Sequence, residues 1–159
     1  MQGFDDLYAA AYPRLVAELT LITGSAPEAE DVVQEAFARA LARWRAVRDL
    51  DEPSAWVRRV ALRLAVSRWR RHQVAAAGLQ RLRAAPALPK EPDLEDVYLL
   101  ALMASVPLQQ RAALVLHYLL DLPLAEIAEI LGVPIGTVKS RLARGRVALA
   151  GELREVDRA

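Results

Sequence analysis

The chain of 159 residues has no cysteine, only two histidines and 6% aromatic residues. Without cysteine it has no disulfide scaffold, no thiol nucleophile and no Cys/His zinc cluster. Its longest apolar run, residues 97–104, is far shorter than the roughly 20 residues of a membrane-spanning helix, and its N-terminus does not resemble a signal peptide. We therefore expect a cytoplasmic protein with no membrane span, no metal and no other cofactor.

The formal net charge is only +1, but the charged residues are unevenly distributed. Residues 1–35 hold seven acids and one base, and residues 36–90 hold thirteen bases and three acids. The order then repeats, with seven acids and one base in residues 91–131 and six bases and three acids in residues 132–159. Two tandem units, each with one basic face, would produce this alternation.

Apolar residues recur at three- and four-residue spacing through most of the chain, which is the pattern of helices that bury one side. This spacing and the turn residues predict helices over residues 4–23, 26–44, 53–72, 94–106, 107–120, 123–132 and 135–150. Residues 45–52 read as a polar loop, and residues 74–92, with three prolines, read as a flexible linker. We expect an all-α protein with two small helical domains, residues 1–73 and 93–159.

Residues 124–142 have the pattern of a helix-turn-helix, with Gly132 and Pro134 at a tight turn between two short helices. The outward residues of the second helix are small, hydroxylated or basic: Thr137, Lys139, Ser140, Arg141, Ala143, Arg144 and Arg146. Such side chains reach phosphates and base edges in a major groove, and small residues allow close approach. The alternative is a helical hairpin whose basic face is only solvated.

The predicted helix over residues 53–72 carries Arg59, Arg63 and Arg70 close together on one side, beside Trp56. Guanidinium groups hold a phosphate backbone while aromatic rings stack on unpaired bases, so this combination suits single-stranded DNA. The residues alone leave two alternatives open, because the arginines also fit a solvated helix side and Trp56 also fits the core.

The helix predicted from residue 26 is acidic opposite its apolar stripe, where Asp31, Gln34 and Glu35 lie. No histidine, cysteine or metal-spaced partner accompanies these acids, which argues against a catalytic role. They are either surface charges that favour a helix N-terminus or a docking face for a basic protein partner.

Together these segments resemble, in order, the extracytoplasmic-function (ECF) sigma factors, bacterial sigma factors that retain only sigma domains 2 and 4. Residues 29–37 are similar to region 2.2 of the family, and residues 53–71 to the regions that melt and read the −10 promoter element. Residues 106–111 and the helix-turn-helix resemble region 4, which reads the −35 element. Residues 67–71 are most similar to a sigma-E-like branch common in actinobacteria.

The resemblance implies a promoter-specificity subunit rather than an enzyme, with the β′ clamp helices and the β flap of core RNA polymerase, promoter DNA and an anti-sigma factor as candidate partners. It implies polymerase-binding roles for Asp31, Gln34, Glu35 and Phe37, and −10 DNA-binding roles for Trp56, Arg59, Arg63, Arg70 and the loop over residues 45–54. It implies −35 DNA-binding roles for Thr137, Lys139, Ser140, Arg141 and Arg144, and a path for the linker toward the RNA channel of the polymerase.

The chain also departs from the family pattern at several positions. Arg63 stands where many relatives have asparagine, Ser67 lies near a common aspartate, and Gly145 stands where many have alanine. Ala143 replaces a larger groove-facing residue, so we expect −35 recognition to depend more on phosphates and DNA shape.

Two rival functions fit the same elements. One is a stand-alone helix-turn-helix repressor in which residues 1–72 dimerise or sense a ligand, and the other is a purely structural interaction module. The acidic second helix favours the sigma-factor interpretation, because a repressor gains nothing from an exposed acidic face there.

Overall fold

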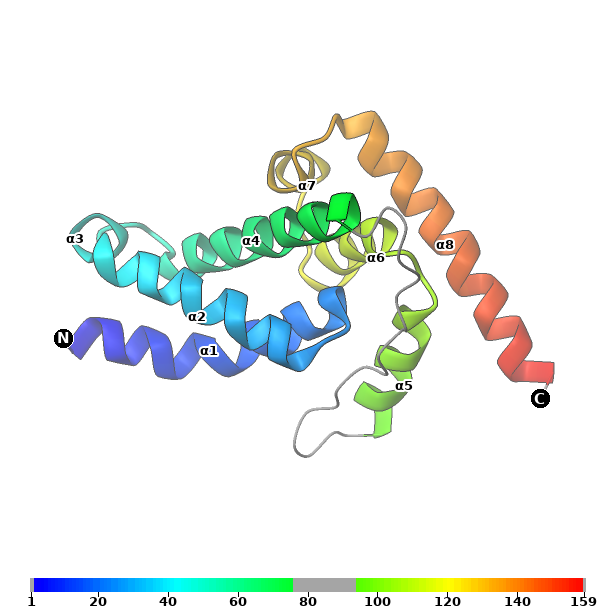
Figure 1. The fold of residues 1–159 in the computed structure, drawn as a ribbon, viewed down its shortest axis with the longest axis horizontal. Coiled ribbons are helices and arrows are strands. Elements are labelled where there is room, and N and C mark those ends of the chain that lie inside the picture. The colour runs from blue at the N-terminus through cyan, green and yellow to red at the C-terminus, as the bar shows by residue number, and fades with distance from the viewer. Residues whose placement is uncertain (1, 76–93, 159) are drawn as a thin grey trace. The chain divides into compact units, whose positions relative to one another are not determined.

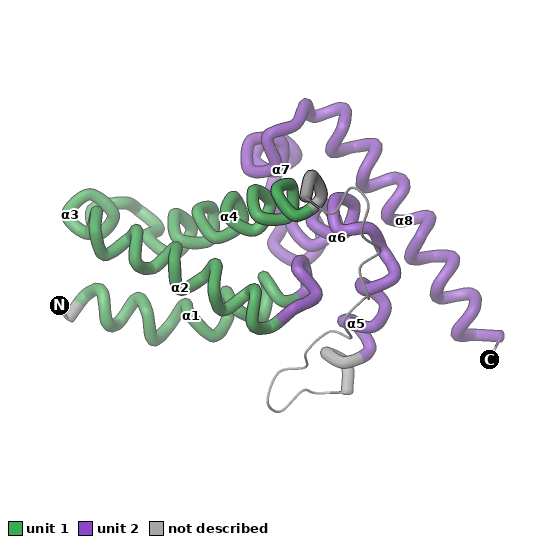
Figure 2. The backbone as a smooth tube through the Cα atoms, in the orientation of Figure 1, with its two compact units in different colours: residues 1–20, 26–85 green, residues 21–25, 86–159 purple. Residues whose placement is uncertain are grey.

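The structure is a computed structural model that describes residues 2–75 and 94–158, and within these ranges all regular elements are helices (Figure 1). The chain divides into two compact units, residues 1–20 with 26–85 and residues 21–25 with 86–159 (Figure 2). The predicted all-α organisation in two domains is confirmed. The predicted linker, apart from its first two residues, lies outside the described residues, and the domain limits at 73 and 93 stay predictions.

Unit 1 contains most of α1 (Gln2–Thr23), with α2 (Ala26–Ala42), α3 (Trp44–Val47) and α4 (Pro53–Ala75). Helices α2 and α4 lie side by side and form the main helix pair of the unit (Figure 1). The apolar stripe predicted for α2 is buried as far as Ala40, whereas Leu41 is 44% exposed. The stripe therefore faces the core, and α2 ends two residues before the predicted limit.

An aromatic cluster closes one side of unit 1. Phe37 of α2 contacts the rings of Phe4 and Tyr8 on α1, with ring centroids 6.2 and 4.8 Å away. Trp44 of α3 packs edge-on against Phe4 at 5.4 Å. Edge-to-face pairs of this kind stabilise a core beyond the area they bury.

The interpretation of residues 45–52 as a polar loop is wrong at its start. Trp44–Val47 forms the short helix α3, and Val47 is only 2% exposed. A single turn of four residues is too short to show helical periodicity, so the sequence pattern gives no sign of this helix.

Unit 2 contains α5 (Leu94–Ala104), α6 (Leu108–Leu114), the π-helical segment η1 (Val115–Leu119), α7 (Leu124–Leu131) and α8 (Ile135–Arg158). The single helix predicted over residues 107–120 thus changes its hydrogen bonding after Leu114. The N–H of Leu120 donates to the carbonyl oxygen of Val115 at 3.1 Å, five residues back, as in a π-turn.

Helix α8 also extends about two turns beyond its predicted end near residue 150. Gly151 lies inside this helix, where one glycine costs only about 1 kcal/mol. None of the described helices is both long and apolar enough to cross a membrane, and the described residues contain no group of acids and histidines arranged for a metal ion.

Candidate functional site

The turn between α7 and α8 has the geometry of a helix-turn-helix. Gly132 ends α7 in the left-handed conformation, with φ 66° and ψ 38°, which glycine adopts without steric cost. The N–H of Val133 donates to the carbonyl oxygen of Ala128 at 3.0 Å, and the carbonyl oxygen of Pro134 accepts from the N–H of Thr137 at 3.0 Å. These bonds end one helix and begin the next within three residues.

Helix α8 buries one side of its first three turns and exposes the other. Val138, Leu142 and Gly145 are buried at positions four and three residues apart. Lys139, Ser140 and Arg144 are exposed, and Thr137 and Arg141 are half-buried. The five residues predicted to bind −35 DNA therefore lie on or beside the outward side of one helix.

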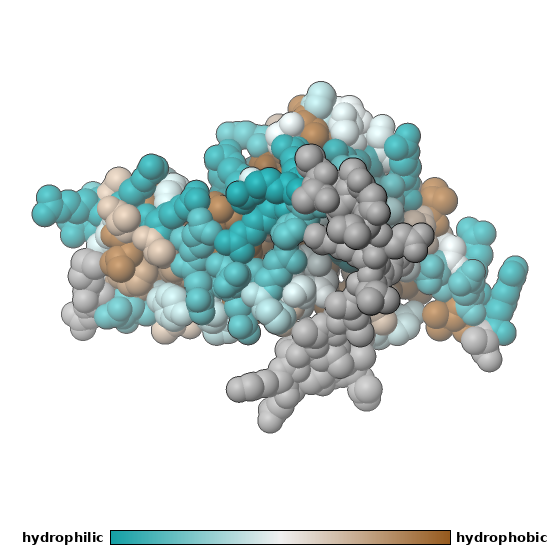
Figure 3. All heavy atoms as spheres, viewed as in Figure 1, coloured by the Kyte–Doolittle hydropathy of each residue, from teal (hydrophilic) through white to brown (hydrophobic). Residues whose placement is uncertain are grey.

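On α4 the predicted −10 residues are less uniformly exposed. Arg63 and Arg70 are exposed, whereas Arg59 and Trp56 are half-buried. Figure 3 shows mostly hydrophilic residues over α4 on the side facing the viewer. Trp56 therefore keeps part of its surface accessible while the rest packs inside unit 1.

The predicted polymerase-binding residues on α2 divide into two groups. Asp31 and Gln34 are exposed and Glu35 is half-buried, so these three are accessible. Phe37 is only 2% exposed and belongs to the aromatic cluster, so the free chain presents little of its ring to a partner, and its role in polymerase binding stays a prediction. Its ring holds α2 against α1.

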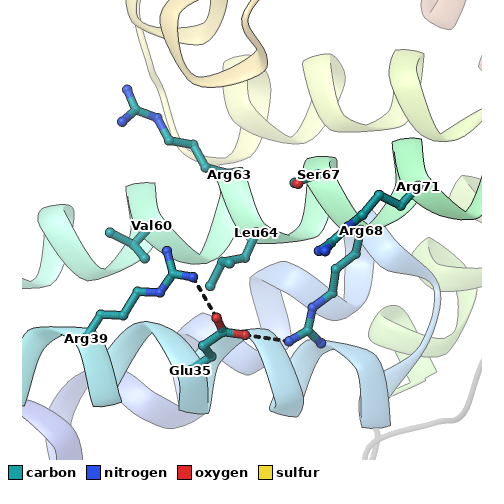
Figure 4. Close-up of a pocket in the computed structure, with 8 residues that line it drawn as sticks. All are labelled: Glu35, Arg39, Val60, Arg63, Leu64, Ser67, Arg68 and Arg71. Atoms are coloured by element: carbon teal, nitrogen blue, oxygen red, sulfur yellow. Dashed lines mark hydrogen bonds and ion pairs between the residues drawn. The ribbon is translucent and has the colours of Figure 1, made fainter.

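Glu35 lies between two arginines that reach it from opposite sides (Figure 4). Nη2 of Arg68 on α4 donates to Oε2 of Glu35 at 2.6 Å, and Nη2 of Arg39 donates to Oε1 at 2.7 Å. Nη1 of Arg68 also donates to Oδ2 of Asp31 at 3.4 Å. These hydrogen bonds, that from Arg68 first, hold the pKa of Glu35 below its ordinary value.

Sequence analysis did not identify Arg68 as a partner of the acidic face. It lies 33 residues from Glu35 and 37 from Asp31, and helical spacing gives no information about which helix packs across such a separation. Ser67, which departs from the family pattern, precedes Arg68 in the sequence, but a serine at that position does not indicate an ion pair at the next one.

The ion pairs lie in an open groove of about 730 Å³ between α2 and α4 (Figure 4). Its lining contains four arginines but one acid: Arg39, Arg63, Arg68, Arg71 and Glu35, with Val60, Leu64 and Ser67. An excess of guanidinium groups in a solvent-open groove favours an anionic ligand such as a phosphate backbone.

Unit 2 has a smaller apolar pocket of about 190 Å³ beside α8. Side chains from α5, α6, η1 and α8 line it: Leu99, Met103, Leu114, Val115, Tyr118, Leu119, Arg146 and Leu149. Tyr118 and Leu119 are 51% and 50% exposed, and Nη1 of Arg146 donates to the hydroxyl of Tyr118 at 3.0 Å. Exposed apolar side chains around a hollow are typical of a protein-docking site.

Two family models match the chain, and both agree with the two units. Sigma-70 region 2 matches residues 7–74, and Sigma-70, region 4 matches residues 96–149. The ECF RNA polymerase sigma factor SigW of Bacillus subtilis is 32% identical, with 96% of this chain and 85% of SigW covered. SigM of Mycobacterium tuberculosis is also 32% identical, with 93% of this chain and 76% of SigM covered.

A solved structure has the same fold. The sigma factor RpoE of Bartonella quintana, crystallised with the anti-sigma factor NepR, superposes with a TM-score of 0.68 over 97% of this chain and 98% of RpoE, at 23% identity. The matches to both regions, the similarity to SigW over most of both chains and the helix-turn-helix geometry together show that this chain belongs to the ECF sigma factors, which direct promoter recognition by RNA polymerase.

Proposed function

We propose that the two units divide the work of promoter recognition. Residues 1–73 would bind core RNA polymerase and the −10 element, residues 93–159 would bind the −35 element, and residues 74–92 would connect them. The protein performs no covalent chemistry itself, because a sigma factor positions the polymerase and is not an enzyme.

Polymerase binding is assigned to the exposed side of α2. Asp31, Gln34 and Glu35 would contact the β′ clamp helices, and Phe37 would fix the helix from the core side. The accessibility of the three polar residues and the burial of Phe37 support this arrangement. The apolar pocket of unit 2 fits an apolar segment and is proposed as the site for the β flap.

DNA contacts are assigned to α4 and α8. Trp56, Arg59, Arg63, Arg70 and the segment over residues 45–54 would hold the unpaired −10 strand. Thr137, Lys139, Ser140, Arg141 and Arg144 would enter the major groove at −35. The observation that carries this assignment is the division of α8 into a side that packs on unit 2 and a basic side that is exposed.

The cellular setting follows from the partners. A subunit of RNA polymerase works where the polymerase works, so we infer a cytoplasmic protein. An anti-sigma factor is a further candidate partner, which the complex of the related RpoE with NepR supports.

Two substitutions separate the proposed surfaces. Lys139→Ala removes one positive charge from the exposed side of α8, and we expect −35-dependent initiation to fall about five- to tenfold while retention on core polymerase is unchanged. Gln34→Ala should do the reverse and weaken core retention about fivefold, the effect of a significant interface residue. Run-off transcription and co-purification with core polymerase measure the two effects.

Arg154→Ala is the matched control for Lys139→Ala, because it removes one positive charge from an exposed position farther along α8. Equal losses in Lys139→Ala and Arg154→Ala would contradict a groove contact by Lys139. A chain that neither binds core polymerase nor supports initiation, but binds palindromic DNA as a dimer, would instead be a repressor.

A further inference from the structure

The interaction that neither the fold nor the family assignment explains is the pairing of Arg68 with the acidic face of α2. Asp31 and Glu35 are proposed polymerase contacts, yet both are already engaged by a guanidinium from α4, at 3.4 and 2.6 Å. Arg68 also lines the arginine-rich groove. One side chain therefore joins the proposed polymerase surface to the proposed DNA surface.

A cationic side chain of a binding partner could displace Arg68 from Asp31 and Glu35. The side chains of Asp31 and Glu35 are 75% and 38% exposed, so a basic side chain of a partner has access to them. The Arg68 side chain is itself 24% exposed, and its ion pairs with carboxylates that water reaches contribute little net stability, so a second cation can replace it. Arg39 keeps Oε1 of Glu35 occupied, so an incoming cation competes with Arg68 for Oε2.

The groove offers Arg68 an alternative partner. Arg63, Ser67 and Arg71 recur every four residues along α4, are exposed, and line the same groove (Figure 4). Four residues of helix rise about 6 Å, so these side chains form a polar row that suits successive phosphates of an extended strand. A released Arg68 would add a guanidinium beside this row.

We propose that Arg68 is shared between the two surfaces and exchanges partners. In the free chain Asp31 and Glu35 hold it. When core polymerase binds those two carboxylates, Arg68 is released and contacts a backbone phosphate of single-stranded DNA. Such an exchange couples the two binding events, and the coupling is reciprocal. Glu35 is ionised at neutral pH, and the hydrogen bonds from Arg68 and Arg39 that lower its pKa extend the pairing to more acidic pH. The proposal rests on the proposed function of α2 as the polymerase-docking face.

Glu35→Gln tests the release of Arg68 directly. In the core-free chain, loss of the carboxylate removes the closer of the two partners of Arg68 and also the partner of Arg39. We expect affinity for a fluorescein-labelled single-stranded oligodeoxynucleotide of mixed sequence to rise about fivefold, the lower end of couplings between sites, and this rise to be lost in Glu35→Gln/Arg68→Ala but kept in Glu35→Gln/Arg39→Ala. The slope of the logarithm of the binding constant against the logarithm of the salt concentration should also become steeper by about 0.7. This change corresponds to one additional phosphate contact on a single strand. Fluorescence anisotropy measures both.

Glu30→Gln is the matched control, because it removes one negative charge from an exposed position of the same helix. Any rise in oligonucleotide affinity that Glu30→Gln causes comes from the change in net charge alone. Equal affinities for Glu35→Gln and Glu30→Gln would overturn the proposal.

Arg68→Ala supplies a second, independent measurement. We expect unchanged oligonucleotide binding by the core-free chain, about fivefold weaker binding by the reconstituted holoenzyme, and core binding that is as tight as wild type or tighter because a competitor is gone. A role of Arg68 in packing alone would weaken all three. Equal loss in the free chain and the holoenzyme would overturn the exchange, since Arg68 would then contact DNA without core polymerase.

Three further results have distinct meanings. Holoenzyme affinity that Arg68→Ala leaves unchanged would overturn the proposal, because Arg68 then holds no phosphate. If Arg68→Ala weakens core binding instead, the groove contacts an acidic segment of the polymerase and the proposal fails. If wild-type chain binds core polymerase but Gln34→Ala binds it equally well, the docking face itself is misassigned, which separates that failure from failure of the exchange.

Discussion

Gly145 lies where α8 passes Leu114 of α6. A Cβ atom at Gly145 would be 2.8 Å from Cδ1 and 3.0 Å from Cγ of Leu114, well inside the 3.5–4.0 Å of a favourable carbon contact. Leu114 is itself 3% exposed and cannot turn freely away. The glycine that replaces the alanine common in relatives therefore permits a closer approach of α8 to α6.

We predict that Gly145→Ala lowers the free energy of unfolding. Overpacking typically costs about 1–3 kcal/mol and alanine gains about 1 kcal/mol of helix propensity, so the net loss should be about 1 kcal/mol. Gly151→Ala is the control, because a Cβ there meets nothing within 4 Å, and it should raise stability by up to about 1 kcal/mol. Urea unfolding followed by circular dichroism compares them, and equal stabilisation by both would contradict the close packing.

Predictions made for single residues were correct where burial alone decided the outcome. The exposure of Lys139 and Ser140 follows from helical spacing, because a residue opposite a buried stripe faces solvent. Helical spacing along α2 also places Phe37 on the buried side, whereas its predicted polymerase-binding role came from the family resemblance. The pairing of Arg68 with Glu35 was not predictable, because it depends on which helix packs against which.

At the scale of elements, the long amphipathic helices were the most predictable. Helix α4 begins at Pro53 as expected and ends at Ala75, close to the predicted residue 72. Helix α7 ends where Gly132 takes a positive φ, as its turn sequence indicated. Periodic burial and distinctive turn residues thus fix where such helices begin and end.

Elements that tertiary packing decides were not predictable. The short helix α3 depends on the burial of Val47, and η1 depends on one shifted hydrogen bond after Leu114. A π-turn inserts a residue into the helical repeat, and here it leaves Tyr118 and Leu119 exposed beside the apolar pocket. Neither feature has a periodic signal in the sequence.

A nearly buried ion pair joins α1 to α4. Nε and Nη2 of Arg58 donate to Oε2 and Oε1 of Glu18 at 2.9 and 3.1 Å, and the two side chains are only 17% and 11% exposed. Nε of Arg14 donates to the same carboxylate at 3.1 Å, but that side chain is 72% exposed. Arg58 therefore provides the main compensation for a carboxylate that is largely removed from water.

We predict that Arg58→Ala lowers the free energy of unfolding by about 2–3 kcal/mol, because a desolvated carboxylate loses its main partner. The loss should be below the largest values for such pairs because Arg14 remains. Arg14→Ala, which removes the solvent-exposed partner of Glu18 on the same helix and leaves Arg58 in place, should cost no more than about 0.5 kcal/mol. Chemical denaturation of both variants makes the comparison, and similar small losses would mean that water already solvates Glu18.

At the scale of the whole molecule, the formal net charge of +1 is the sum of acidic and basic surfaces with different tasks. The exposed acids of α2 suit protein docking, and the basic residues of α4 and α8 suit DNA. Each proposed DNA-binding surface carries only a few basic residues, so neither is expected to bind a promoter tightly alone. In a complex with one polymerase, binding of one surface to the promoter would raise the effective concentration of the other surface at its own element. The two surfaces together would then bind the promoter strongly.

The order of these surfaces along the chain was predictable, because charge and helical spacing are local properties. The promoter sequence is not a local property of this kind, because it depends on single side chains such as Arg63, Ser67 and Ala143, which lie at or beside the proposed DNA-binding positions. Two of them, Arg63 and Ser67, share the groove with Arg68, where the exchange of partners is proposed.

The most direct test of the account is run-off transcription from a library of genomic promoters with core polymerase and the purified chain. The account predicts that the chain co-purifies with core polymerase and that the mixture starts transcription at a discrete set of promoters sharing −35 and −10 elements. It also predicts loss of these products in Lys139→Ala without loss of co-purification. A chain that leaves core polymerase unbound and start sites unchanged, while binding palindromic DNA as a dimer, would contradict it.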